Sequence, residues 1–329
     1  MDRLGEFLNY KNLIFGIAYR MTGSFSDAED IVQESYLRWE RSKEQEIKSA
    51  KAFLSTIAAR LSLDSLRKAQ RKRETYIGPW LPEPLPPQDE SEPDLETLDL
   101  AFLHLLEKLN PIERAVFLLR ESFGMEYGSI AKAIGKTPDN CRQILKRAKV
   151  SLKSESRKFD ADLETKRTLV RKFILASSKD QPELLLSYLK EDIVVWSDGG
   201  GKVHAARIPI LGKERVASFL LRVRKNRSFL KGLEFYFAEN NGNQSIIAYS
   251  ENQPVFMQHY LFDGEGISRI YSLVNPDKLC AYSDKEGLLA SGKLIPLELF
   301  LLFPKTAFGK AVVPSWTKPV LSLVRWVFR

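Results

Sequence analysis

The sequence predicts a multidomain protein in which two all-α domains precede an α+β domain. Its 329 residues exceed what one ordinary core requires, since domains of roughly 150 residues are common. Helical spacing of apolar residues dominates up to about residue 160, and short β-branched or aromatic runs dominate after about residue 168. This change of period places the α+β domain in the second half of the chain.

The charge pattern divides the helical half. Between Tyr76 and Leu100 there is no Lys or Arg, whereas seven carboxylates and several prolines occur. Proline favours a polyproline-like backbone and like charges repel, so residues 76–100 are predicted to form an extended, semi-rigid linker. The expected domains are therefore residues 1–75, 101–160 and 165–282, and an apolar, basic extension follows over 283–329.

Composition narrows the classes of function. A net charge of +8 fits an anionic partner, although the surplus is small for this length. Cys141 and Cys280 lie far apart without metal-ligand spacing, so no disulfide framework, metal or cofactor is expected. The N-terminus lacks the pattern of a secretory signal, and no apolar run reaches the about 20 residues of a membrane span. A cytoplasmic protein is expected.

Residues 110–152 carry the strongest local signal, a helix-turn-helix. Tyr127, Ile130, Ala131 and Ile134 have helical spacing, and Gly135 is a typical C-terminal residue. Thr137 then predicts the N-cap of a further helix. That helix would bury one apolar face, formed by Cys141, Ile144, Leu145, Ala148 and Leu152. Amide and basic side chains would cover the other face, as suits the major groove, although a solvated basic helix remains the alternative.

A second basic helix is predicted over residues 53–75. Cations recur at three- or four-residue spacing on one of its faces, where they could follow DNA phosphates or simply be solvated. Upstream, SFSDAEDIVQESYLRWE predicts an N-capped helix that begins with acidic residues, as the helix dipole favours.

Three runs of the sequence, in their order along the chain, resemble regions 2 and 4 of extracytoplasmic-function sigma factors, a group of the sigma-70 family. They are YRMTGSFSDAEDIVQESYLRW, KAFLSTIAARLSLDSLRKAQRKR and NPIERAVFLLRESFGMEYGSIAKAIGKTPDNCRQILKRAK. Three further motifs, WLPEP, DGGGK and NPDKL, resemble the subgroup with a C-terminal SnoaL-like domain of the nuclear transport factor 2 superfamily. The implied fold is a region 2 helical bundle, a region 4 helix-turn-helix and a cone-shaped α+β domain.

The resemblance implies a role for each matching residue. Core RNA polymerase, through its β and β′ subunits, would be bound by Asp27, Asp30, Gln33, Glu34 and Trp39. The minus-ten promoter element would be held by Arg60, Asp64, Arg67, Lys68 and Arg71, and the loop 44–51 would receive an extruded base. The minus-thirty-five element would be read by Asn140, Arg142, Gln143, Lys146 and Arg147. The linker motif comprises Trp80, Leu81, Pro82, Glu83 and Pro84.

The C-terminal domain is expected to regulate the sigma domains. Its candidate regulatory interface or cavity residues are Asp198, Gly199, Gly200, Gly201, Lys202, Asn275, Pro276 and Asp277. A cavity of this fold could hold a small-molecule ligand. Because enzymatic relatives use Asp or His as acid-base groups in such a cavity, Asp198, His204 and His259 are candidate catalytic residues. The candidate lining residues are Trp196, Tyr249 and Tyr260. A turn at Asp198 and a structural His259 are the preferred interpretations. The apolar tail is expected to pack on the domain rather than on a membrane surface.

The predicted function is that of a sigma factor without enzymatic activity. It would bind core polymerase and direct DNA-templated transcription initiation at minus-ten and minus-thirty-five elements, under regulation by the fused domain. One alternative is a small-molecule isomerase or cyclase with an accessory helical domain, and another is a polymerase-independent DNA-binding repressor. Turnover, or tight duplex binding without polymerase, would distinguish these alternatives.

Overall fold

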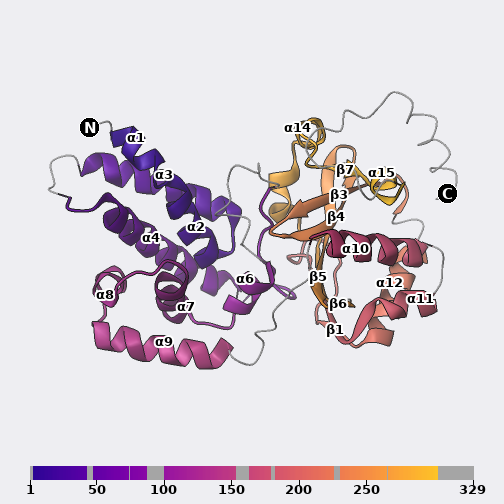
Figure 1. Cartoon of the computed structure of the whole chain (residues 1–329), viewed down its shortest axis with the longest axis horizontal. Helices are drawn as coiled ribbons and strands as arrows, with labels where there is room; N and C mark the ends of the chain where they lie inside the picture. The colour runs from indigo at the N-terminus through magenta and orange to yellow at the C-terminus, as the bar shows by residue number, and fades with distance from the viewer. Residues whose placement is uncertain are drawn as a thin grey trace. The chain divides into compact units, whose positions relative to one another are not determined.

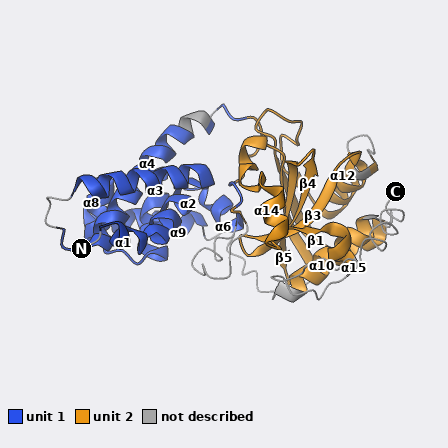
Figure 2. Cartoon of the chain, turned by 90° about the horizontal axis from the view of Figure 1, so that it is seen from above, with its two compact units in different colours: residues 1–76, 82–84, 90–156 blue, residues 77–81, 85–89, 157–329 orange. Residues whose placement is uncertain are grey.

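The computed structural model describes residues 3–42, 47–73, 75–86, 100–152, 163–178, 182–225, 230–264 and 266–302. Two compact units make up the chain (Figure 2). The first contains residues 1–76, 82–84 and 90–156, and the second contains residues 77–81, 85–89 and 157–329. Residues 87–99 of the predicted linker and 303–329 of the predicted extension lie outside the described residues.

The first unit is all-α, as predicted (Figure 1). Before the linker it contains α1 (Arg3–Leu8), α2 (Lys11–Thr22), α3 (Phe25–Arg41) and α4 (Ala50–Arg73). After the linker it contains α6 (Leu100–Leu106), α7 (Pro111–Phe117), the π-helical turn η1 (Leu118–Ser122), α8 (Tyr127–Ile134) and α9 (Pro138–Leu152). Helix α4 packs against α2 and α3 and also against α7 and α8, so helices from both sides of the linker share one unit.

Local sequence signals account for the helix ends. The predicted N-capped helix could begin at Ser24 or Ser26, and the structure shows Ser24 as the cap of α3, where it accepts a hydrogen bond from the N–H of Asp27. Asn110 and Glu113 form a reciprocal capping box around Pro111, which occupies the favoured first position of α7. Gly135 ends α8 in the left-handed conformation with φ of 69°, which a residue with a Cβ adopts only at a cost.

One predicted helix differs in the structure. Pro111 and the break at Gly124 predict one helix that runs from Pro111 toward Phe123, but α7 ends at Phe117 and the chain continues as η1. In this turn the N–H of Phe123 bonds to the carbonyl of Leu118, five residues earlier. A π-helical turn of this kind holds about one more residue than an α-helical turn. The spacing of apolar residues alone does not reveal where such an extra residue is inserted.

The second unit is α+β. Its seven-stranded sheet contains β1 (Leu189–Asp198), β2 (Ile210–Leu211), β3 (Glu234–Asn240), β4 (Asn243–Ser250), β5 (Gln253–Asp263), β6 (Gly266–Leu273) and β7 (Ile295–Pro296). The order across the sheet is β2-β1-β6-β5-β4-β3-β7, with β1 parallel to β6 and the other pairs antiparallel. Register shifts after Leu189, Ala248 and Leu261 are the kind of irregularity that bends a strand.

Helices cover one face of this sheet. They are α10 (Leu163–Ser178), α11 (Pro182–Ser187), α12 (Lys213–Lys225) and α15 (Leu297–Leu302). The core beneath them contains Phe173 of α10, Val216 of α12 and Tyr260 of β5. The ring of Phe300 in α15 stacks on that of Phe237 in β3, so the part of the C-terminal extension up to residue 302 packs on the sheet, as expected.

Strand register assigns the opposite face. Ser245 pairs with His259, and His259 pairs with Tyr271, in one row across β4, β5 and β6. Because side chains alternate along a strand, this row points away from the helix-covered face that holds Tyr260. The segment after β6 lies over this second face, where it includes the 3₁₀ turns η2 (Pro276–Lys278) and η3 (Cys280–Tyr282) and the helix α14 (Lys285–Ala290).

Candidate functional site

Helix α9 has the predicted division into two faces. Cys141, Ile144, Leu145, Ala148 and Leu152 are all buried. The proposed base-reading and phosphate-binding side chains are all exposed, and they are Asn140, Arg142, Gln143, Lys146 and Arg147. The hydroxyl of Thr137 caps the helix by accepting from the N–H of Asn140. Helix α9 therefore presents donors and acceptors along one continuous solvent face.

Two contacts hold Arg142 on that face. Its guanidinium forms an ion pair with Asp139, and it lies 5.1 Å from the ring centroid of Tyr127 in α8. Both partners lie at the beginning of their helices, where the helix-turn-helix brings them together. An arginine restrained in this way loses less conformational freedom on binding a base edge or a phosphate.

Helix α4 exposes most of the cations predicted for the minus-ten element. Arg67 and Lys68 are exposed, and Arg67 pairs loosely with Asp64 at 3.4 Å. Arg60 donates to the carbonyls of Lys132 at 2.8 Å and Ala133 at 3.4 Å, at the C-terminal end of α8. The C-terminal end of a helix carries a partial negative charge that attracts a guanidinium group. Arg60 therefore links α4 to the end of α8 within the first unit. Of Arg71, only its place in α4 is described, and residues 44–46 of the base-receiving loop 44–51 are outside the described part of the chain.

Helix α3 carries the proposed polymerase-binding residues. Asp30 and Gln33 are exposed, and Glu34 pairs with Arg38 one turn later at 2.8 Å. Asp27 is half-buried and accepts from the hydroxyl of Ser65 in α4 at 3.1 Å. It therefore helps to pack α3 on α4.

Trp39 occupies a different environment from the one that its assigned role requires. Its side chain is only 2% exposed, its indole N–H donates to the carbonyl of Arg3, and the Arg3 guanidinium covers its ring at 3.9 Å. Trp39 thus fastens α1 to α3 in the core, because its position in the helix lies on the buried side with Ile31, Val32 and Ser35. A surface contact between this side chain and polymerase does not fit that burial.

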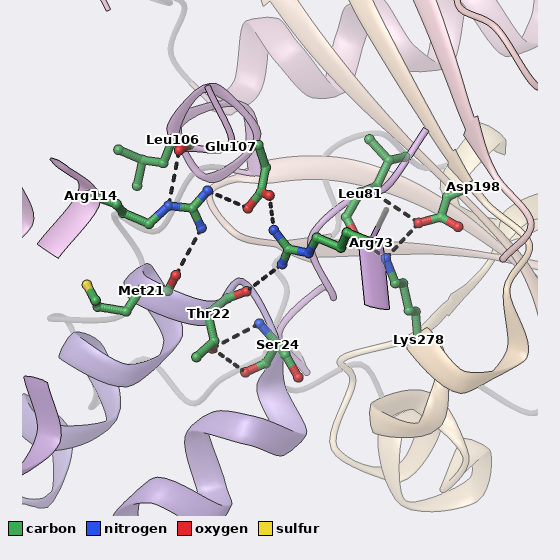
Figure 3. A network of polar contacts seen from close by, with 10 residues as sticks. All are labelled: Met21, Thr22, Ser24, Arg73, Leu81, Leu106, Glu107, Arg114, Asp198 and Lys278. Atoms are coloured by element: carbon green, nitrogen blue, oxygen red, sulfur yellow. Dashed lines mark hydrogen bonds and ion pairs between the residues drawn. The ribbon is translucent and has the colours of Figure 1, made fainter. Parts of the chain in front are cut away.

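An ion cluster that the sequence did not indicate joins the helices of the first unit (Figure 3). Glu107 forms ion pairs with Arg73 of α4 and with Arg114 of α7. Arg114 is buried and also donates to the carbonyls of Leu106 and Met21. Charged residues far apart in the chain gave no periodic signal that could have predicted this cluster.

The linker residue Leu81 binds the second unit through its backbone (Figure 3). Its N–H donates to Asp198 Oδ2 at 2.8 Å, and its carbonyl accepts from Lys278 Nζ. Asp198 and Lys278 are buried and form an ion pair of 2.7 Å. The ammonium of Lys278 also lies 4.0 Å from the ring centroid of Trp80. Asp198 and Lys278 therefore form a charged clamp for the backbone N–H and carbonyl of one linker residue, Leu81.

The clamp joins the two motifs DGGGK and NPDKL. Lys202 pairs with Asp277 on the surface, and the N–H of Asn275 bonds to the carbonyl of Asp198 at 3.0 Å. Gly200 has φ of 59°, and a Cβ there would lie 2.4 Å from Asn275 Nδ2, so glycine is required for this close approach. Lys278 was missed among the candidate residues, although its place in the NPDKL motif was a usable signal.

Glu83 binds the first unit, to which it belongs. Its N–H donates to the carbonyl of Gly23 at 2.8 Å, and its carboxylate accepts from the N–H of Phe25 at 2.8 Å, the first residue of α3. Prolines 82, 84 and 86 have no N–H, so Leu81, Glu83 and Leu85 carry the amide donors of residues 81–86. Each of these three donors is bonded. The predicted extended linker is thus a docked segment over these residues.

The candidate cavity residues do not converge on one face. Tyr260 points to the helices, where its ring contacts that of Phe173. Asp198 and His259 lie on the other face, and His204 is in an exposed loop. Asp198 does begin the predicted turn, since it accepts from the N–H of Gly200. Within the described residues, no group of three or more His, Cys, Asp or Glu side chains could hold a metal ion.

Comparison with known proteins identifies the family. Residues 7–72 match Sigma-70 region 2, and residues 99–152 match Sigma-70, region 4. The protein named "Probable ECF RNA polymerase sigma factor SigI" of Mycobacterium tuberculosis is 31% identical over 220 residues, which are 65% of this chain and 74% of the relative. The chain belongs to the extracytoplasmic-function sigma factors.

A second relative extends the likeness of this sigma factor to the C-terminal unit. ECF RNA polymerase sigma factor SigJ of Mycobacterium tuberculosis is 29% identical over 298 residues, covering 86% of this chain and 95% of the relative. The crystal structure of SigJ is similar with a TM-score of 0.68 and 25% identity, over 84% of this chain and 98% of that chain.

Core RNA polymerase and promoter DNA are therefore the partners of this sigma factor, and its function is transcription initiation. This identity does not favour the isomerase or the repressor. Within the described residues, no helix is long and apolar enough to cross a bilayer.

Proposed function

We propose that this sigma factor binds core polymerase through α3, holds the minus-ten element through α4 and reads the minus-thirty-five element through α9. The observation that carries the proposal is the two-sided character of α9, whose buried face is apolar and whose exposed face contains Arg142, Gln143 and Lys146. Amide and guanidinium groups on an exposed helix are suited to base edges in the major groove. On α3, Asp30 and Gln33 offer an acidic and polar surface for a basic partner.

The proposal includes regulation by the C-terminal domain. Asp198 and Lys278 bind the peptide N–H and carbonyl of Leu81, so the domain holds the same linker that connects the two sigma regions. A linker held in this way is restricted in the paths it can follow on polymerase. The domain would act through this grip, without catalysis and in the cytoplasm where transcription occurs. The proposed domain boundaries are residues 1–75 for region 2, 76–100 for the linker and 101–160 for region 4. The C-terminal α+β domain comprises residues 165–282, and the extension comprises residues 283–329.

Run-off transcription with core polymerase and genomic promoter fragments tests both parts. The unchanged full-length protein should direct initiation from discrete start sites. The variant Lys278→Met should alter the yield at least threefold, because the clamp loses its cation while Asp198 keeps its bond to Leu81.

The matched control is Lys202→Met, which breaks the exposed ion pair with Asp277 in the same motifs. Exposed pairs contribute little, so its yield should stay within about twofold of the unchanged protein. Absence of initiation by the unchanged protein would refute promoter recognition. Equal yields from Lys278→Met and Lys202→Met would refute regulation through the clamp but would leave promoter recognition intact.

A further inference from the structure

A second linker residue, Leu85, is bound by the second unit at a place outside the three motifs. Its N–H donates to Asn241 Oδ1 at 3.0 Å, and its carbonyl accepts from Tyr282 Oη at 2.7 Å. The Leu85 side chain is 2% exposed. Leu85 lies between Pro84 and Pro86, which have no N–H, so its own amide is the donor available to a receptor at this point of the linker.

The hydroxyl of Tyr282 is oriented by a chain of buried side chains. Asn240 Nδ2 donates to Tyr282 Oη, and Ser245 Oγ donates to Asn240 Oδ1 at 2.7 Å. Ser245 Oγ also lies 2.7 Å from His259 Nδ1. Asn240, Ser245, His259 and Tyr282 are all buried.

This connectivity determines the form of His259. A serine hydroxyl has one hydrogen, and that of Ser245 is given to Asn240, so Ser245 Oγ must accept from an N–H at His259 Nδ1. Burial, with the charge of Lys166 as a smaller cause, lowers the pKa of His259 to about 3, so the imidazole is neutral. Its Nε2 is then the unprotonated nitrogen, and this atom has no hydrogen-bond donor among the described residues.

The hydrogen bonds therefore run in one direction. His259 donates to Ser245, Ser245 donates to the carbonyl end of Asn240, and the amide end of Asn240 donates to Tyr282. Because Tyr282 Oη accepts from Asn240, its own hydroxyl hydrogen is donated to the carbonyl of Leu85. Reversing any one bond would turn the donor at Tyr282 away from the linker.

We propose that His259 is a positioning residue for the linker, which fixes the Ser245–Asn240–Tyr282 chain in the direction that offers a donor to the Leu85 carbonyl. This inference rests on the proposed regulatory role of the linker. It assigns to His259, whose imidazole is buried and neutral, a task distinct from acid-base chemistry. His259 does not touch the linker and acts through Tyr282.

Amide hydrogen exchange of full-length protein, measured by mass spectrometry without polymerase, tests the proposal. Tyr282→Phe should speed exchange in residues 77–86 about fivefold, as expected for the loss of one neutral hydrogen bond. His259→Leu, which removes the donor to Ser245, should speed it about threefold or more. His259→Asn places an amide N–H near the former Nδ1 and should restore exchange to within about twofold of the unchanged protein.

Tyr260→Phe is the matched control. Tyr260 is the neighbour of His259 in β5, and its hydroxyl donates to Gln258 Oε1 at 2.7 Å on the helix-covered face. This variant loses one part-buried hydrogen bond from a tyrosine hydroxyl without touching the chain to Leu85, so exchange in 77–86 should not change.

Three outcomes would overturn the proposal. The first is unchanged linker exchange in His259→Leu. The second is faster exchange in His259→Leu that affects β4, β5 and β6 as much as residues 77–86. The third is a failure of His259→Asn to restore protection. Because no polymerase is present, these failures are distinct from a failure of clamp variants to alter run-off transcription.

Discussion

At the scale of single residues, one carboxylate in the first unit forms ion pairs with two guanidinium groups. Glu107 lies between Arg73 and Arg114, which come from helices on either side of the linker. Burial lowers the pKa of Arg73, with Glu107 opposing this effect, so the arginine is costly to bury without its partner. The side chain of Arg114 is 3% exposed. An unpaired charge there would have little access to water.

We therefore expect Glu107→Gln to destabilise the first unit. Breaking a buried pair costs about 3–5 kcal/mol, and the partial exposure of Glu107 reduces this to roughly 2–3 kcal/mol. Urea unfolding followed by far-ultraviolet circular dichroism should show the helical transition at lower urea. Asp64→Asn, which removes the exposed pair with Arg67, is the control and should shift the free energy of unfolding by at most about 0.5 kcal/mol. Equal shifts in both variants would contradict the assignment.

At the scale of elements, α9 combines packing and recognition on opposite faces. Its buried residues hold it against α7 and α8, and the left-handed Gly135 and the cap at Thr137 set where it begins. Because these constraints come from the helix ends and the core, exposed residues can change with little effect on the position of the helix.

Gln143→Ala should therefore weaken promoter recognition without unfolding the helix. Loss of a base-edge contact costs about 1–3 kcal/mol and relaxes the preference at one base pair of the minus-thirty-five element. Initiation from promoters mutated at each position of that element would measure this effect. Val150→Ala changes an exposed apolar residue of the same helix and should leave the preference intact. A uniform loss at every position in Gln143→Ala would instead indicate a phosphate contact.

At the scale of the whole molecule, the proposed function requires α4 and α9 to bind one promoter at the same time. Each neutralised phosphate contributes about 0.9 to the slope of log affinity against log salt concentration. Lys68 of α4 and Arg147 of α9 are suitable probes because both are exposed, whereas Arg60 already bonds to the end of α8.

Lys68→Ala and Arg147→Ala should each reduce the slope of the polymerase–promoter complex by about 0.9, and the double variant should reduce it by about 1.8. Filter binding of the holoenzyme to promoter DNA across a salt series gives the slope. Lys231→Ala, an exposed lysine of the second unit, should leave it unchanged. A double variant with the slope of either single variant would show that only one of the two helices contacts DNA.

Local signals along the chain are sufficient to predict most helices and strands and most of their exposed faces. Capping residues, left-handed glycines and helical spacing act within a few residues, so α3, α8 and α9 and the burial of Cys141 and Ile144 could be predicted. Among the β-branched or aromatic runs predicted after about residue 168, IVVW, SIIAYS and FMQHYLFD lie in β1, β4 and β5. The run LEFYFA lies in β3 apart from its first residue. The family followed from ordered motifs in regions 2 and 4.

The contacts between groups distant in the chain become visible only in the folded protein. The partners of Glu107, the linker contacts of Asp198 and Lys278, and the burial of Trp39 against Arg3 join residues that are far apart in the chain. The face occupied by His259 depended on strand register, because a shift of one residue exchanges the two faces of a strand. Local patterns fix neither register nor long-range pairing, since both arise from the packing of complete elements.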